Sequence, residues 1–398
     1  MNTQHKTIAI LTGGSDVPGL NPAIRAITIR AIKEGYRVLG LRRGWAGLLE
    51  IDTTPKANNI HNFVELSVAL VNKAARTGGT FLHTTRIRPD KLMARDVPTH
   101  LHEEFPEATN DLTPVIVRNL EWLGVDYLIP IGGDDTLGYA LKLHKLGIKI
   151  VAIPKTMDND VPGTDYCIGF STCVTRSISL ANSLRTSAGS LERILILEVF
   201  GRYAGYTAML PTLTGSANRC VIPEHPFHAN QLVQLLAQDR DASSNRYAVV
   251  IVSEGARMIG FEDQLCPPEE IDFDDTNKKG GIGQLIADQI QTLSPEYNRG
   301  KTINTIYQKL GYMVRGGDPD AIDSLVPMAF GNMAMDLIGK NITGRLVILK
   351  NGRYDHTELE VVATSKNLVD VARFYNTERL RPFYNSFDMH PLFIMTGQ

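Results

Sequence analysis

The chain has 398 residues, a formal charge of −2 at pH 7 and a sequence pI near 6.6. Apolar residues make up 43% and charged residues 21%, so the chain can form a substantial core and disorder is excluded as its main state. The nearly neutral charge provides no basic footprint for nucleic acid or for an anionic membrane, and we expect neither as a partner. Two or three domains are expected at this length.

Targeting segments and cysteine usage both favour the cytoplasm. The first apolar run, 8–11, is too short for the core of a signal peptide, and no run approaches the roughly 18 apolar residues of a membrane span. The cysteines form no Cys-x-x-Cys pair and no zinc-type spacing with histidine; they are Cys167, Cys173, Cys220 and Cys266. We expect small buried thiols in a reducing compartment.

Short apolar strands alternate with longer amphipathic helices along the chain. We predict strands at 8–11, 37–41, 127–131, 149–153, 193–199, 219–222, 247–252 and 345–349, with an extended segment at 302–314. Between them we predict helices at 18–34, 113–123, 171–187, 203–210, 283–293 and 318–340, and one more that follows the strand at 127–131 and ends at 146. Residues 52–62 and 262–279 are expected to be loops.

This alternation predicts the fold class. Strands that alternate with helices form a parallel sheet covered on both faces. The units are too many for one open sheet, so we expect an α/β protein of two doubly wound, mostly parallel, Rossmann-like domains. Ligands of such sheets bind at the carboxyl ends of the strands, and the active site is therefore expected in the cleft between the domains.

The first strand end carries the glycine pair Gly13-Gly14. Adjacent glycines let a backbone approach an anion, and the N-terminus of the following helix adds partial positive charge. The segment is neither a Walker loop nor G-x-G-x-x-G, and a structural turn is an equal alternative.

The strand at 127–131 is followed by Gly132-Gly133-Asp134-Asp135-Thr136. A turn requires no pair of adjacent carboxylates, although both could simply stabilise the N-terminus of the next helix. The other interpretation is a magnesium carboxylate, because Mg²⁺ takes one or two protein carboxylates together with phosphate oxygens.

The strand at 149–153 leads into Pro154-Lys155-Thr156-Met157-Asp158-Asn159-Asp160. A lysine supplies a point charge for phosphate, and an aspartate can accept a hydroxyl proton. A solvated turn is the alternative, which the position next to the double-aspartate loop disfavours.

Several further charged residues lie at strand ends or after glycine pairs: Arg86, Arg193, Arg202, Glu254 and Arg315. Each arginine alone is best interpreted as a surface residue. Together they indicate an anionic substrate with more than one phosphate.

Taken together, these segments resemble the phosphofructokinase family, in the family's order and over about residues 7–320. The matching pieces are Thr12-Gly13-Gly14, Pro18-Gly19-Leu20-Asn21, Gly78-Gly79-Thr80-Phe81-Leu82 with Arg86, Gly132-Gly133-Asp134-Asp135-Thr136, Pro154 to Asp160, Glu198-Val199-Phe200-Gly201-Arg202, Ser253-Glu254-Gly255 and Arg315-Gly316-Gly317. The Lys-Thr-x-Asp-Asn-Asp piece is highly specific, whereas glycine pairs alone are not.

The resemblance implies Mg²⁺-dependent transfer of a phosphoryl group to the 1-hydroxyl of fructose 6-phosphate. Asp158 matches the catalytic base, and Asp134 the magnesium ligand. The implied catalytic group is completed by Lys155, Thr156, Asp160 and Arg202; the donor-binding residues are Gly14, Arg86, Gly133 and Asp135; and the sugar-phosphate residues are Arg193, Phe200, Gly201, Glu254, Tyr312 and Arg315.

The resemblance also implies a domain organisation and an assembly. Residues 1–165 with about 316–372 would bind the donor and Mg²⁺, and residues 166–315 with about 373–398 would bind the sugar phosphate. In the family, the residue that matches Arg193 comes from a neighbouring subunit. A homodimer or homotetramer with a shared site is therefore implied.

Two positions favour pyrophosphate as the donor. Family members that use ATP carry glycine at the positions of Asp135 and Lys155, so this chain resembles the pyrophosphate-dependent branch. Asp135 is expected to place an uncompensated carboxylate where the α-phosphate of ATP would lie, and Lys155 to neutralise the leaving phosphate. The chain departs from the family at Ile306, where an arginine is usual, and at Tyr312, where a histidine is common. Arg299 and Lys301 are the candidates to replace the missing arginine.

The leading hypothesis is thus a phosphotransferase that uses pyrophosphate and forms fructose 1,6-bisphosphate and phosphate reversibly. The first alternative is an ATP-dependent 6-phosphofructokinase. The second is a non-catalytic regulatory subunit that binds sugar phosphates, which Asp134, Lys155 and Asp158 argue against. A dinucleotide-binding dehydrogenase is disfavoured because the glycine fingerprint is missing.

Overall fold

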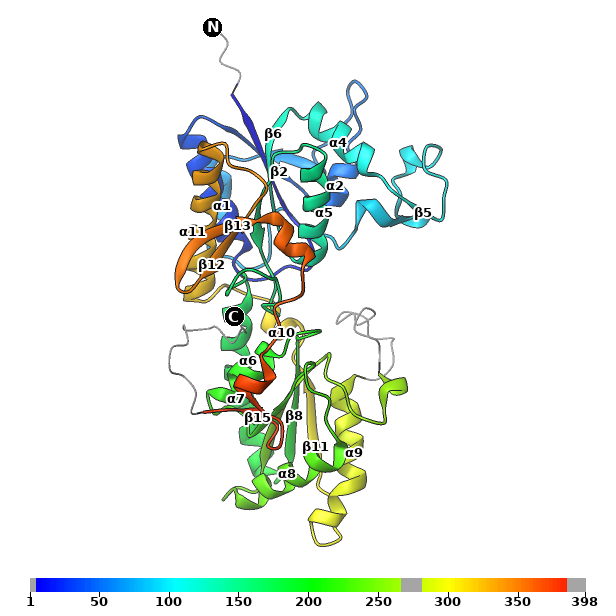
Figure 1. The fold of residues 1–398 in the computed structure, drawn as a ribbon, viewed down its shortest axis with the longest axis vertical. Helices are drawn as coiled ribbons and strands as arrows, with labels where there is room; N and C mark the ends of the chain where they lie inside the picture. The colour runs from blue at the N-terminus through cyan, green and yellow to red at the C-terminus, as the bar shows by residue number, and fades with distance from the viewer. Residues whose placement is uncertain (1–4, 266–280, 385–398) are drawn as a thin grey trace. The chain divides into compact units, whose positions relative to one another are not determined.

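A computed structural model of the chain describes residues 5–265 and 281–384 (Figure 1). The chain forms two compact units. Unit 1 comprises Met1–Thr156, Val161–Gly169 and Gly316–Ser365, and unit 2 comprises Met157–Asp160, Phe170–Arg315 and Lys366–Gln398. Both units are α/β folds built on mostly parallel sheets, which confirms the predicted fold class.

Unit 1 contains a seven-stranded sheet in the order β13-β12-β7-β6-β1-β2-β3. The strands are β1 Thr7–Thr12, β2 Arg37–Leu41, β3 Phe63–Glu65, β6 Val125–Gly132, β7 Val151–Pro154, β12 Arg345–Lys350 and β13 Arg353–Glu358. The inner pairs are parallel, whereas β3 and β13 are antiparallel edges. Every residue of β1 is buried, as expected for a strand covered on both faces.

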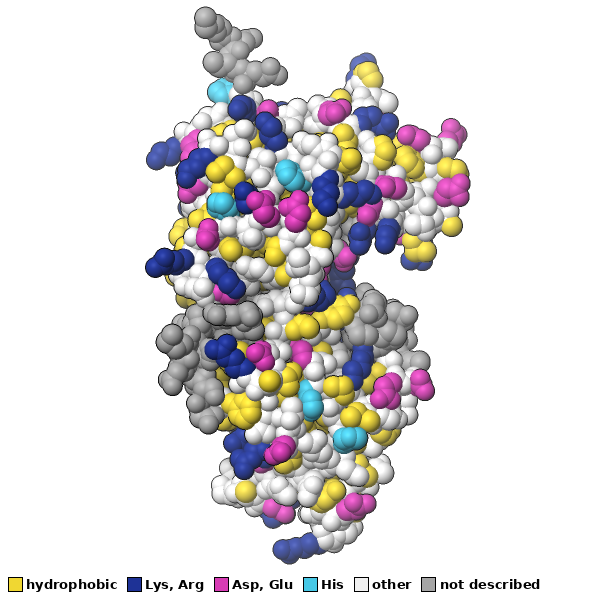
Figure 2. Space-filling model, viewed as in Figure 1, with side chains coloured by type: hydrophobic (Ala, Val, Ile, Leu, Met, Phe, Trp, Pro, Cys, Tyr) yellow, Lys and Arg dark blue, Asp and Glu magenta, His cyan; other side chains and the backbone are white. Residues whose placement is uncertain are grey.

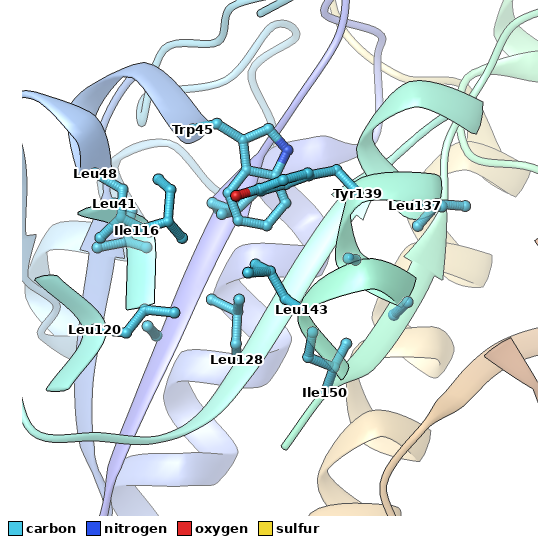
Figure 3. Close-up of a cluster of buried hydrophobic side chains, with 14 of the residues drawn as sticks. Leu41, Trp45, Leu48, Ile116, Leu120, Leu128, Leu137, Tyr139, Leu143 and Ile150 are labelled. Atoms are coloured by element: carbon cyan, nitrogen blue, oxygen red, sulfur yellow. The ribbon is translucent and has the colours of Figure 1, made fainter. Parts of the chain in front are cut away.

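Helices cover both faces of this sheet (Figure 1). One face carries α2 Trp45–Leu49, α4 Thr113–Trp122 and α5 Asp134–Lys145, and the other carries α1 Leu20–Lys33 and α11 Ala321–Gly339. Under α2, α4 and α5 lies a core of leucine and isoleucine side chains around Trp45 and Tyr139, whose rings meet edge to face with centroids 4.9 Å apart (Figure 3). Such a pair adds about 0.5–1.5 kcal/mol beyond area burial.

Unit 2 contains a four-stranded parallel sheet in the order β11-β8-β10-β9. The strands are β8 Ile194–Val199, β9 Arg219–Val221, β10 Ala248–Ser253 and β11 Thr305–Lys309. The helices are α6 Phe170–Ser190, α7 Tyr206–Leu213, α8 Ala229–Ala242, α9 Ile282–Tyr297, α10 Tyr312–Arg315 and α12 Val371–Phe374. The short hairpin of β14 Tyr375–Asn376 and β15 Arg381–Pro382 follows in the chain.

Most predicted elements are present, with some differences. The segment predicted as extended over 302–314 is a strand only over Thr305–Lys309 and then turns into α10. The helix predicted at 203–210 begins at Tyr206, because the chain first bends through Gly201 at φ +128°. The loop at 52–62 is confirmed, whereas most of the loop predicted at 262–279 lies outside the described residues.

Several elements were not predicted, and β13 and α8 illustrate two different reasons. The edge strand β13 has the polar sequence Arg-Tyr-Asp-His-Thr-Glu and is largely exposed, so no apolar run marks it. Helix α8 does bury Leu232, Val233, Leu236 and Ala237 at helical spacing, a signal that was present in the sequence.

Surface and burial agree with the composition. Among the described residues, no helix is long and apolar enough to cross a membrane. The view in Figure 2 shows side chains of both charge signs interspersed on the visible face. Cys167, Cys173 and Cys220 are buried, and burial raises the pKa of the Cys220 thiol to about 12; Cys266 lies outside the described residues.

Candidate active site

In unit 1, the carboxyl ends of β1 and β6 approach each other closely at their glycines. A Cβ atom added at Gly13 would lie 2.4 Å from Oγ1 of Thr136, and one added at Gly132 would lie 2.4 Å from the Cβ of Thr136. Thr136 is itself only 3% exposed. Glycine is therefore required at both strand ends, and the two loops that follow are held side by side.

Lys155 is buried at the end of the neighbouring strand, with 4% exposure. Its backbone N–H donates to the carbonyl of Gly132 at 2.9 Å, and its Nζ donates to the carbonyl of Ser15 at 2.5 Å. Gly14 has φ +78°, and a Cβ there would lie 3.1 Å from the Lys155 Nζ. The ammonium group thus lies directly beside the first glycine loop, as an anion site requires.

Arg86 lies in the same group, because its Nε donates to Oγ of Ser15 at 2.7 Å. Gly14 donates its N–H to the carbonyl of Thr85 at 2.9 Å, which fixes the glycine loop against the arginine segment. One loop therefore brings together two of the predicted donor-binding residues, Gly14 and Arg86, with Lys155 of the predicted catalytic group.

The structure corrects the expectation for the charge of Asp135. Its carboxylate was expected to be uncompensated, but Oδ1 lies 3.7 Å from Nη1 of Arg88, and the Asp135 side chain is 74% exposed. An exposed pair of this kind contributes only about 0–1 kcal/mol, and Arg88 also pairs with Asp90 at 3.1 Å, so it offsets only part of the repulsion that Asp135 exerts on a nearby phosphate. Arg86 and Arg88 are two residues apart in the sequence, which does not indicate which of the two side chains faces the Asp135 carboxylate.

Asp134 is the first residue of α5, where a carboxylate is favoured by the helix dipole, and Gly133 precedes it as the N-cap. Among the described residues, no group of three His, Cys, Asp or Glu side chains could hold a metal ion. The protein side chains alone therefore do not form a complete metal site. A single carboxylate does fit Mg²⁺ that is also held by the phosphate oxygens of a substrate.

In unit 2, Asp158 lies beside Arg202. Oδ2 of Asp158 accepts the backbone N–H of Arg202 at 3.2 Å. Burial, and next the negative charge of Asp158, raise the pKa of the Glu254 carboxyl well above its usual range, while Arg202 acts in the opposite direction. Asp158, Arg202 and Glu254 thus form one electrostatically connected group at the ends of β8 and β10.

Glycines give these two strand ends their shape. Gly201 has φ +128°, and a Cβ there would lie 2.8 Å from the carbonyl of Ala204. A Cβ at Gly255 would lie 1.9 Å from the carbonyl of Arg202, and the Gly255 N–H donates to the carbonyl of Gly201 at 3.1 Å. The close approach holds the Arg202 backbone in place against Asp158.

Arg315 and Phe200, both predicted for the sugar phosphate, are in contact. The guanidinium carbon of Arg315 lies 4.6 Å from the centre of the Phe200 ring, and the two residues are 5% and 4% exposed. The ring orients the guanidinium by a cation–π interaction. Tyr312, one turn earlier in α10, is 63% exposed.

Arg193 is separated from this group within its own chain. It precedes β8, whereas Phe200 and Gly201 follow it, and a six-residue strand spans about 20 Å. Ile306 pairs with Leu195 in the sheet, so the position of the missing arginine also lies near the amino end of β8. The role of Arg193 in a neighbouring subunit stays a prediction.

The chain passes from unit 1 to unit 2 between Thr156 and Met157 and returns between Asp160 and Val161. Lys155 and Asp158 are three residues apart, so covalent geometry keeps their Cα atoms within about 11 Å. Asp160 is 6% exposed. The segment predicted to be most specific thus supplies residues to both units.

One open hollow of about 1430 Å³ lies elsewhere. It is lined by residues at the amino ends of β1, β2 and β6, including His5, Arg37, Trp122 and Asp126. None of the predicted site residues lines it. Its size alone therefore gives no reason to move the candidate site away from the carboxyl ends.

The phosphofructokinase family model matches residues 7–338. A pyrophosphate–fructose 6-phosphate 1-phosphotransferase of Dictyoglomus thermophilum is 35% identical over 382 residues, which cover 95% of this chain and 98% of the relative. The ATP-dependent 6-phosphofructokinase 2 of Clostridium perfringens is 34% identical over 376 residues, with 94% and 96% covered. The names of the relatives therefore include both donors.

Solved structures show the same fold. A pyrophosphate-dependent phosphofructokinase from Marinobacter aquaeolei superimposes with a TM-score of 0.71 at 18% identity, covering 99% of this chain and 92% of that chain. The phosphofructokinase of Saccharomyces cerevisiae gives a TM-score of 0.68 at 23% identity over 90% of this chain, which spans 45% of the length of the yeast chain.

Proposed function

The chain belongs to the phosphofructokinase family and is a phosphotransferase, and from this premise we propose that it transfers a phosphoryl group from pyrophosphate to the 1-hydroxyl of fructose 6-phosphate. The observation that carries the proposal is the buried ammonium of Lys155 beside the Gly14–Ser15 loop, with Arg86 on the same serine. A fixed cation against a glycine loop suits a small, highly charged donor.

In the proposed reaction, Asp158 accepts the proton of the 1-hydroxyl as its oxygen bonds to the transferred phosphorus. The bond from that phosphorus to the bridging oxygen breaks, and inorganic phosphate leaves with the electron pair. Asp158 is oriented for this by the backbone N–H of Arg202. Catalysis would consist mainly of positioning and charge neutralisation, as in phosphoryl transfer generally.

The remaining residues divide between the two ligands. Lys155 and Arg86 would neutralise the leaving phosphate, and Thr156 and Asp160 would complete the transfer loop. Arg315, oriented by Phe200, would bind the 6-phosphate, and the raised pKa of Glu254 would let its carboxyl keep a proton and donate to a sugar hydroxyl. Asp134 would hold Mg²⁺, which supplies charge neutralisation to the phosphate oxygens when bound.

ATP is the second candidate donor, and two observations favour it. A relative of nearly equal identity is named for ATP, and Arg88 reduces the repulsion by Asp135. The bulk of Asp135 and the charge of Lys155 still favour pyrophosphate, because both positions would face the donor.

The test is turnover of fructose 6-phosphate by the full chain with pyrophosphate or ATP as the only donor, with and without Mg²⁺. We expect kcat/KM for pyrophosphate to exceed that for ATP by at least about 100-fold, or about 2.7 kcal/mol. A preference for ATP would overturn the donor assignment, and no turnover with either donor would overturn the proposed reaction.

A further inference from the structure

The segment 366–369, here called the C-terminal strap, lies against the loop that carries Asp158. The Asn367 backbone N–H donates to the carbonyl of Asp160 at 3.0 Å, and its side-chain Nδ2 donates to the carbonyl of Asn159 at 3.1 Å. Two successive carbonyls of the loop are thus held by one asparagine. All of these residues belong to unit 2.

Lys366 adds a charge to this contact. Its Nζ lies 3.5 Å from Oδ2 of Asp160 and 4.6 Å from the centre of the Tyr203 ring. The Asp160 side chain is 9% exposed and that of Lys366 is 29% exposed, so the pair is more shielded than an ordinary surface ion pair. Tyr203 follows Arg202, whose backbone holds Asp158.

The other end of the strap is fastened to the start of α7. Oε1 of Glu224 accepts the N–H groups of Val369 at 2.9 Å and of Gly205 at 3.0 Å, and the Tyr206 hydroxyl donates to the carbonyl of Leu368 at 2.7 Å. The strap therefore connects the 158–160 loop to the segment that follows Arg202. It thus contacts both segments that form the Asp158–Arg202 hydrogen bond, the one that carries Asp158 and the one that follows Arg202.

The loop has a conformational reason to need this support. Asn159 has φ +57° and is 1% exposed, and only glycine, asparagine and aspartate adopt this left-handed region readily. Such a conformation persists when its surroundings determine it, and here the surroundings include the bond from Asn367. Release of that bond would let the neighbouring Asp158 side chain change its direction.

We propose that Lys366 and Asn367 are positioning residues, which hold the Asp158–Asp160 loop in the geometry needed for proton transfer. They act through the loop and are not assigned any contact with substrate. The proposal rests on the proposed function, because it concerns the reaction assigned to Asp158. It gives a role to a stretch of chain in which the sequence shows no motif.

The test compares Lys366→Met, Asn367→Ala and the conservative Lys366→Arg in the full chain, with Lys340→Met as a control at an exposed lysine of unit 1. A displacement of about 1 Å at a reacting group can cost about 100-fold in rate. We expect Lys366→Met and Asn367→Ala to lower kcat by roughly 10-fold or more, while KM for both substrates changes less than about 3-fold. Lys366→Arg should keep at least about a third of kcat, and Lys340→Met should match the unchanged protein.

The outcomes separate this proposal from the proposed function. No turnover by the unchanged protein with either donor overturns both. Normal turnover by the unchanged protein together with unchanged kcat in Lys366→Met and Asn367→Ala overturns the positioning role alone, as does a rise in KM at unchanged kcat. Melting temperatures are measured for every variant; if Lys366→Met does not fold, Asn367→Ala decides by the same comparison.

Discussion

The two units hold their charged side chains in different ways at the same structural position, the carboxyl ends of parallel strands. In unit 1, the glycine loops are joined by cations, with Lys155 and Arg86 both bonded to Ser15. In unit 2, carboxyl groups gather at the strand ends, with Asp158 and Glu254 interacting across Arg202. Glycines shape both edges, so the residues beside them decide the chemistry that each edge suits. Under the proposed function, the unit 1 edge binds the phosphoryl donor, and the unit 2 edge serves proton transfer and binds the 6-phosphate.

The largest effect is expected at the unit 2 edge. Asp158→Asn should lower kcat by about 100–10,000-fold with little change in KM, because a positioned base is lost while the shape is kept. Steady-state kinetics with both substrates varied would measure this. Asp288→Asn, at an exposed position on α9, is the matched control and should be silent. If Asp158→Asn kept more than about a third of wild-type kcat, Asp158 would not be the general base.

Substitution of Arg193 tests whether one chain alone supplies every residue of the sugar-phosphate site at the unit 2 edge. If Arg193 binds the 6-phosphate in a neighbour's site, Arg193→Ala should raise KM for fructose 6-phosphate by about 10–100-fold and leave KM for the donor nearly unchanged, since a hydrogen bond to a charged group contributes about 1.5–3 kcal/mol.

Subunit mixing sharpens this prediction. Arg193→Ala and Asp158→Asn chains mixed after dissociation should recover activity, because some hybrid sites would contain both native residues. Exchange would be verified by tagging one chain. Absence of recovery after verified exchange would argue against a shared site.

Donor choice tests the unit 1 edge. A carboxylate about 4 Å from a phosphate charge repels it by about 1 kcal/mol in bulk water and about 4 kcal/mol at an effective dielectric of about 20. Because Asp135 is exposed and pairs with Arg88, we expect the lower figure, so Asp135→Gly should raise kcat/KM for ATP by less than about 10-fold.

Companion variants separate charge from bulk at this edge. Lys155→Gly should damage pyrophosphate use without admitting ATP, and only the double variant with Asp135→Gly should give appreciable ATP turnover. Arg88→Met should lower ATP use further, because it leaves the Asp135 charge without its cation. Unchanged ATP use by Arg88→Met would show that the ion pair does not affect the donor.

The smallest effect concerns stability and pH. A carboxyl whose pKa is raised by folding binds its proton more tightly in the folded state, so stability falls as pH rises from the unfolded pKa towards the folded one. Glu254→Gln removes this penalty. Its melting temperature should therefore fall less than that of the unchanged protein between pH 4.5 and pH 8, by about 2–4 °C. Thermal unfolding at both pH values measures it, and parallel pH dependence would show that folding does not raise the pKa of the Glu254 carboxyl.

Features carried by short stretches of sequence could be predicted. The strands, the glycine loops after them and the Lys155–Asp160 segment are local patterns, and the carboxyl-end rule places them together. The contact of Gly14 with Lys155 joins the ends of β1 and β7, which β6 separates in the sheet, so the carboxyl-end rule predicts the shared edge but not this close approach.

Features that depend on distant or rotameric contacts could not be predicted. Nothing in residues 366–369 indicates that they touch the loop at 158–160, because more than 200 residues separate them. The side chain of Arg88 rather than Arg86 faces Asp135, which is decided by side-chain direction along an irregular segment. Helix α8 is different, since its apolar spacing was visible in the sequence.

The division of unit 1 into separate stretches has a consequence for its synthesis. Strand β7 ends at Pro154, and its outer neighbour β12 begins at Arg345, so most of unit 2 is translated before the unit 1 sheet can be completed. At about 5–20 residues per second, the ribosome needs roughly 10–40 s for that interval. During this time the edge of β7 has no strand partner, and such an edge pairs readily with other chains. A nascent chain is therefore expected to need protection by a chaperone at this edge until β12 emerges.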